Sequence, residues 1–151
     1  MPPVDNKKEA MSAFINPEDY DASIHAEILD SLLRANKTTL ETCEDRAVET
    51  VRGYLAGRYD TAAIFTAEGE ARHPLVLMVA IDIAIYHVFC QHNPQKMSEV
   101  RLKRYDDALD WLKQVQKGEV TIYGAPTLDE ETAARNGYYL MRSDTKRENR
   151  V

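Results

Sequence analysis

The residue with the clearest chemical potential in this sequence is Asp82, a single carboxylate inside an apolar run from Leu75 to Cys90. A buried carboxylate can act as a catalytic acid or base, or it can form an ion pair that holds a core together. No nucleophile or second acid lies at a recognisable spacing from Asp82, so the sequence favours the structural role. We predict that Asp82 pairs with Arg58, with Arg104 as the second candidate. Losing one partner of such a buried pair costs about 3–5 kcal/mol.

His87, Cys90 and His92 form the cluster that most resembles a metal site. His87 and Cys90 are three residues apart and share a helical face, whereas His92 points elsewhere. A zinc site needs three or four converging ligands. Walker-type phosphate loops and dinucleotide fingerprints are also missing from the sequence. We therefore predict no metal, no cofactor and no catalytic residues.

The composition is typical of one folded domain with a tail. The chain has 151 residues, 44% of them hydrophobic and 29% charged, and a formal net charge of -6, which argues against broad binding to a nucleic-acid backbone. Cys43 and Cys90 each lie on an apolar stripe, so we predict buried free thiols and synthesis in a reducing cytoplasm. The run at 75–90 is shorter than the roughly 20 residues that a bilayer requires, and it carries an acid. We therefore expect a core helix and no membrane partner.

Hydrophobic periodicity predicts an all-α fold, a small bundle of about four helices around a central apolar helix at 74–91. A helix that is apolar on every side must be covered on every side, either by its own chain or by other copies of it. The remaining helices are expected at about 17–35, with residues 21–23 as the place for a break, at about 38–57, and at about 98–118.

The connections carry the less regular parts of the chain. Residues 58–73 are predicted to be a long loop, and loops of this length in compact domains are often functional. Ile64 and Phe65 are expected to anchor this loop on the core and to contribute to partner contacts. The β-formers that alternate over residues 119–124 predict a short extended segment.

Both ends of the chain are expected to extend from a helical domain at 16–124. Residues 1–15 are predicted to be a flexible arm, and residues 125–151 an irregular tail. Residues 136–151 carry a net charge of +2, which leaves -8 for the rest of the chain. A basic, aromatic tail on an acidic body favours contact with a neighbouring body. The tail residues predicted to contact another chain are Tyr138, Tyr139, Arg142, Lys146 and Arg147.

The order of these parts resembles a known family. The sequence Gly53-Tyr-Leu-Ala-Gly-Arg-Tyr-Asp60 ends an amphipathic helix, and Asp82-Ile-Ala-Ile-Tyr86 lies in the apolar helix. A third stretch runs from Val100 to Leu112, and Lys117-Gly-Glu-Val-Thr-Ile122 follows it. Over about residues 12–122, this arrangement resembles Mu-like phage and prophage proteins of formally unknown function. That family is in turn similar to phage head–tail connector, head-completion or neck proteins.

The resemblance implies a structural subunit without catalysis. Connector subunits are all-helical and form a ring between the portal and the tail. We therefore expect a homo-oligomeric ring on assembly, with a monomer in isolation, and a location in the virion neck after synthesis in the host cytoplasm. The implied partners are the portal protein and a tail-proximal adaptor, with at most passing contact with DNA in the channel.

Two other classes of function compete with this expectation. A helical module that binds DNA or a packaging partner requires a basic recognition helix, whereas the second helix is acidic and the fourth is mixed. An enzyme should show an open pocket lined by polar groups. A connector is expected to show no such pocket around Asp82.

Overall fold

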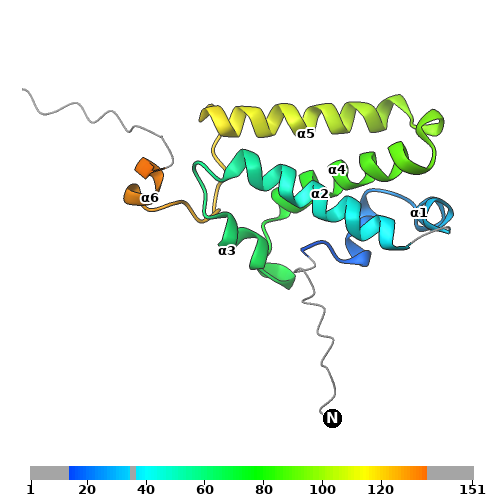
Figure 1. Cartoon of the computed structure of the whole chain (residues 1–151), viewed down its shortest axis with the longest axis horizontal. Helices are drawn as coiled ribbons and strands as arrows, with labels where there is room; N and C mark the ends of the chain where they lie inside the picture. Colours follow the sequence, from blue (N-terminus) through cyan, green and yellow to red (C-terminus); the bar gives the residue numbers. More distant parts are fainter. Residues whose placement is uncertain (1–13, 35–36, 136–151) are drawn as a thin grey trace, which may run out of the picture.

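The computed structural model describes residues 14–34 and 37–135, which form an all-α protein (Figure 1). Three long helices, α2 (Lys37–Leu55), α4 (Pro74–His92) and α5 (Glu99–Lys117), pack side by side, and α4 runs opposite to the other two. The shorter helices of the described residues are η1 (Pro17–Ala22), α1 (Ala26–Leu33), α3 (Thr61–Thr66), η2 (Gly69–Ala71), η3 (Pro94–Lys96) and α6 (Glu130–Arg135).

Helix α4 is the centre of the core, which confirms the prediction of a central apolar helix. Every residue from Val79 to Ile85 is buried, so the helix is covered around most of its circumference by α2, α5 and the shorter elements. Pro74 occupies its first turn, where the missing N–H costs nothing, and Asn93 and Pro94 end it. The sequence alone was sufficient to place both ends of this helix.

Helix α5 also follows its sequence signals. The Ser98 hydroxyl accepts a hydrogen bond from the Arg101 N–H at 3.3 Å, which caps the first turn. Gly118 ends the helix with a φ of +84°, a left-handed conformation that favours glycine. The helix buries Ala108, Leu112 and Val115 in the core.

The N-terminal region differs from the predicted single helix at 17–35. It consists of η1 and α1, and the chain is non-helical from Ser23 to His25, two residues later than the break expected at 21–23. Phe14 and Ile15 are buried in the core, so these two residues belong to the body rather than to the predicted flexible arm. Residues 1–13 of that arm lie outside the described part of the chain.

The predicted loop at 58–73 contains helix α3. Asp60 begins it, because its side chain accepts a hydrogen bond from the Ala63 N–H at 3.1 Å. Ile64 and Phe65 are buried, which confirms that they anchor this region on the core. Their own chain covers both side chains in this structure, so their contribution to partner contacts stays a prediction.

Residues 118–128 are tied to the end of α2. The N–H of Ile122 donates to the Tyr59 hydroxyl at 2.8 Å, and the N–H of Asp60 donates to the Pro126 carbonyl at 2.9 Å. Tyr59 and Thr127 form an isolated antiparallel bridge, and the described residues contain no β-strand. The predicted extended segment at 119–124 is therefore irregular and is fixed to the body by hydrogen bonds; we call residues 118–128 the strap. Its hydrogen bonds continue into the predicted tail, at Pro126 and Thr127.

Replacing Tyr59 with phenylalanine is expected to lower the free energy of unfolding by about 1–3 kcal/mol, because the buried N–H of Ile122 would lose its acceptor. Urea denaturation followed by circular dichroism measures this change. Tyr123 is 95% exposed and provides the control, since Tyr123→Phe should leave the midpoint unchanged. Equal midpoints for wild type and Tyr59→Phe would contradict the importance of this strap.

Among the described residues, α4 is the helix that is long and apolar enough to cross a membrane by length and composition alone. However, 56% of its apolar stretch is buried inside the protein, and it carries Asp82. Soluble proteins with a fully apolar core helix give the same signal.

Candidate interaction surfaces

Asp82 is 5% exposed and forms its ion pair with Arg104 of α5. The distance from Asp82 Oδ1 to Arg104 Nη2 is 3.1 Å. The predicted pairing with Arg58 is wrong, and the second candidate is the observed partner. Arg58 instead donates from Nη1 to the Val115 carbonyl at 2.7 Å, so it neutralises the C-terminal end of α5 rather than a carboxylate.

The positive charges near Asp82 compensate only part of the cost of burying its carboxylate. Burial raises the pKa of this carboxyl, and the charges of Arg104 and Arg101 offset the rise only in part. Oδ1 is held by the ion pair with Arg104 and has no further donor among the described residues. Buried oxygens of this kind are uncommon in folded proteins and call for an explanation.

Asp82 lies beside a groove of about 280 Å³ between α4 and α5, hereafter the α4–α5 groove. Three charged side chains line it, namely Asp82, Arg104 and Asp107. The remaining lining is apolar and consists of Leu75, Met78, Val79, Ala108 and Trp111. A groove therefore does lie beside Asp82, although it is not the polar-lined pocket that an enzyme was expected to show. The mostly apolar lining favours a contact surface over a polar catalytic cleft.

A second groove, hereafter the α1–α5 groove, has a volume of about 570 Å³ and is lined partly by Ile28, Phe89 and Arg101. Arg101 has hydrogen-bond and ring-stacking partners within the chain. Its guanidinium donates to the Ser23 carbonyl at 3.1 Å and stacks over the Phe89 ring. The guanidinium of Arg101 is therefore already paired by groups of its own chain.

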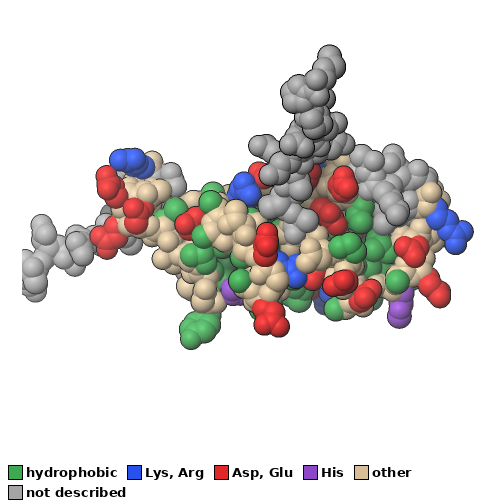
Figure 2. All heavy atoms as spheres, turned by 90° about the horizontal axis from the view of Figure 1, so that it is seen from below, with side chains coloured by type: hydrophobic (Ala, Val, Ile, Leu, Met, Phe, Trp, Pro, Cys, Tyr) green, Lys and Arg blue, Asp and Glu red, His purple; other side chains and the backbone are tan. Residues whose placement is uncertain are grey.

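Exposed hydrophobic side chains occur at both grooves. Met78 is 44% exposed at the α4–α5 groove, and Ile28 is 45% exposed at the α1–α5 groove. Figure 2, which views the molecule from below, shows hydrophobic side chains reaching the surface between many acidic groups. Apolar side chains at an acidic surface favour partners that combine apolar and basic character.

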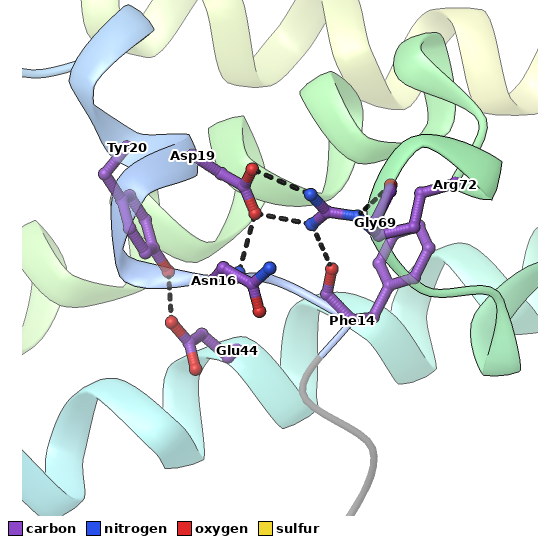
Figure 3. Close-up of polar contacts among 7 residues, drawn as sticks. All are labelled: Phe14, Asn16, Asp19, Tyr20, Glu44, Gly69 and Arg72. Atoms are coloured by element: carbon purple, nitrogen blue, oxygen red, sulfur yellow. Dashed lines mark hydrogen bonds and ion pairs between the residues drawn. The ribbon is translucent and has the colours of Figure 1, made fainter.

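The N-terminal region is fixed to the core by a half-buried ion pair that the sequence did not reveal (Figure 3). Arg72 forms a two-point contact with Asp19, in which Nη2 donates to Oδ1 at 3.0 Å and Nη1 donates to Oδ2. Arg72 also donates to the carbonyls of Phe14 and Gly69. Asp19 and Arg72 are 53 residues apart in the chain, so no local sequence signal could have paired them.

A hydrogen bond next to this ion pair joins η1 to α2. The Tyr20 hydroxyl donates to Glu44 Oε1 at 2.6 Å (Figure 3). Burial raises the pKa of Glu44, and it also raises the pKa of Tyr20. The N-terminal region is therefore a structural part of the body, and its polar groups are occupied by internal contacts.

The cluster that resembled a metal site does not converge. No group of three or more possible metal ligands occurs among the described residues. Cys43 is buried, but Cys90 is exposed, so the prediction of two buried thiols is wrong for Cys90. Burial lowers the pKa of His87, which favours the neutral form of this imidazole.

Five of the predicted partner contacts cannot be located in the structure. They lie outside the described residues and remain predictions. These residues are Tyr138, Tyr139, Arg142, Lys146 and Arg147.

The fold and its surfaces define a small all-α protein built around one buried helix, with apolar grooves on an acidic exterior. The chain belongs to the family described as Bacteriophage Mu, Gp36, whose profile matches residues 10–141. It is therefore a protein of Mu-like phages or prophages, as the resemblance implied. No match was found among curated proteins or among solved structures.

Proposed function

We propose that this protein is a head–tail connector subunit that assembles into a ring between the portal and the tail. Its membership of the Bacteriophage Mu, Gp36 family supports a role in a phage particle or its assembly. In this role the protein binds partners and catalyses no reaction. Its partners are other copies of the chain, the portal protein and a tail-proximal adaptor.

The α4–α5 groove is the observation that carries the structural part of this proposal. A subunit of a ring needs a rigid body and an exposed surface that fits its neighbour. The three long helices supply the body, and the partly exposed Leu75 and Met78 supply an uncovered apolar surface on its central helix. A site for turnover would instead require converging polar groups.

Deletion of the gene from the phage or prophage that encodes it tests this role. We expect DNA-filled heads and free tails that fail to join, and complementation with the full-length chain should restore complete particles. Empty heads would instead favour the alternative, a helical module that binds DNA or a packaging partner. Normal infectious particles without the protein would contradict both functions.

A further inference from the structure

Helix α4 is not completely covered by its own chain. Its middle is buried, but Leu75 and Met78 in its first two turns are 36% and 44% exposed, and both line the α4–α5 groove. Trp111 of α5 forms part of the opposite wall. A helix this apolar favours a cover for the rest of its surface, and the described residues do not provide one.

The charged groups of the groove show what kind of cover fits. Asp107 lines the groove and forms no ion pair within the described part of the chain. Asp82 adds a second carboxylate to the wall, but Arg104 already pairs with it and its Oδ1 is not accessible from the groove. An occupant with apolar or aromatic side chains and a cation would therefore complement both walls and Asp107.

The chain itself contains a segment with this chemistry. Residues 138–142 read Tyr-Tyr-Leu-Met-Arg, which places two phenolic donors, two aliphatic side chains and one guanidinium in sequence. The 16 residues from 136 to 151 carry a net charge of +2, against -8 for the remainder of the chain. The segment and the body are thus complementary in charge as well as in apolar character.

The path of the chain favours a neighbouring copy as the recipient of this segment. The described residues end at α6, which has no buried residue and projects from the α3 end of the body (Figure 1). Residues 138–142 follow Arg135 by three to seven residues, which span at most about 10–25 Å when extended. The proposed segment therefore directly follows a projecting element, where a second molecule can approach it.

We propose that the α4–α5 groove of one copy binds residues 138–142 of a second copy. Arg142 faces Asp107, and Leu140 and Met141 cover Leu75 and Met78. Such a contact is heterologous, so it closes into a ring when the rotation between copies permits. This inference deepens the proposed connector function and rests on it for the closed ring.

Site-specific photo-cross-linking of the full-length chain tests this contact. Leu140→p-benzoylphenylalanine protein is prepared in unlabelled and ¹⁵N-labelled form, mixed in equal amounts, irradiated over a concentration series and analysed by mass spectrometry. We expect mixed-isotope cross-links from residue 140 to α4 or α5 residues of the groove, with a yield that rises with concentration.

Two variants with matched exposure distinguish the grooves. Met78→Glu should reduce the mixed-isotope cross-links by about tenfold or more, which corresponds to a loss of about 1.4 kcal/mol in binding. Ile28→Glu introduces the same charge at the α1–α5 groove and should leave the yield unchanged. Thermal unfolding followed by circular dichroism verifies that both variants fold.

A charge exchange keeps the test decisive if Met78→Glu fails to fold. Asp107→Arg and Arg142→Asp should each lower the cross-link yield several-fold, and the double variant should restore it. Cross-links confined to single chains, cross-links outside the groove, or the absence of groove cross-links at every concentration would overturn the proposal. A result of this kind would contradict the groove contact but not the connector role, which the gene deletion tests separately. Conversely, intact particles after gene deletion would contradict the connector role but not the groove contact.

Discussion

Replacing Arg72 with methionine is expected to lower the free energy of unfolding by about 1.5–3 kcal/mol at pH 7, the usual contribution of hydrogen bonds to charged groups. Asp19 is only 15% exposed at its side chain, so the substitution leaves a half-buried charge without its counter-ion. The Phe14 carbonyl loses a donor at the same time. Denaturation in urea, followed by the helical circular dichroism signal, measures this loss.

The pH dependence identifies the ion pair as the cause. The hydrogen bond from Arg72 lowers the pKa of Asp19 in the folded state. The stability that this pair contributes is therefore fully present above the unfolded pKa of about 3.9 and is lost as the pH falls through the lower folded value. The difference between wild type and Arg72→Met should shrink below about pH 4.

Arg135→Met is the control for this prediction, because Arg135 pairs with Glu131 at a largely exposed position. Exposed pairs contribute about 0–1 kcal/mol, so this variant should remain close to wild type. A similar loss in both variants, or an Arg72→Met difference that does not depend on pH, would contradict the structural role assigned to the half-buried pair.

Replacing Arg104 with methionine is expected to cost about 2–3 kcal/mol at pH 7, somewhat less than for a fully buried pair. Arg104 is 36% exposed, so water already screens part of the interaction. The same exposure means that removing Asp82 instead leaves no buried charge behind, because Arg104 can turn to solvent. Asp82→Leu is therefore expected to be neutral or stabilising, in place of the cost of about 3–5 kcal/mol expected from the sequence.

The sign of the pH effect is opposite to that at Asp19. Burial already raises the pKa of Asp82, and loss of Arg104 should raise it further. The folded variant then binds a proton more readily than the unfolded chain, so its stability rises as the pH falls from 7 toward the folded pKa of Asp82. The deficit of Arg104→Met should consequently shrink at pH 5.

A comparison of urea midpoints for wild type, Arg104→Met and Asp82→Leu at pH 7 and pH 5 measures both effects. If Asp82→Leu unfolds the protein while Arg104→Met does not, Asp82 has a structural partner other than Arg104.

The long helices could be predicted because each has a complete set of local signals. Pro74 begins α4 and Asn93 follows it, while Ser98 and Gly118 delimit α5. Helix α3 was missed although it has such a signal. Asp60 is a good N-cap residue, and the run Thr-Ala-Ala-Ile-Phe-Thr after it can continue a helix.

The partners of charged groups could not be predicted in the same way. Arg58 contacts the end of α5 and Arg104 contacts α4, and a guanidinium is satisfied equally well by a carboxylate or by backbone carbonyls. The choice between them depends on the relative rotation of α2, α4 and α5, which the helical period alone does not fix. The Asp19–Arg72 pair depends on how two distant segments meet.

The α4–α5 groove was predictable only in outline. The apolar run at 75–90 predicted a helix covered on every side, and the structure buries seven consecutive positions of it. The sequence left open whether other copies of the chain would complete the cover. The structure places the uncovered part at Leu75 and Met78. Hydrophobicity could not distinguish these two residues from their buried neighbours, because all of them are strongly apolar.

Cryo-electron microscopy of purified particles of the encoding phage tests the connector role most directly. The account predicts a ring of copies of this chain between the portal and the tail, with α2, α4 and α5 recognisable in each subunit. Particles that contain no such ring at the neck, or that hold the protein only elsewhere in the virion, would contradict it.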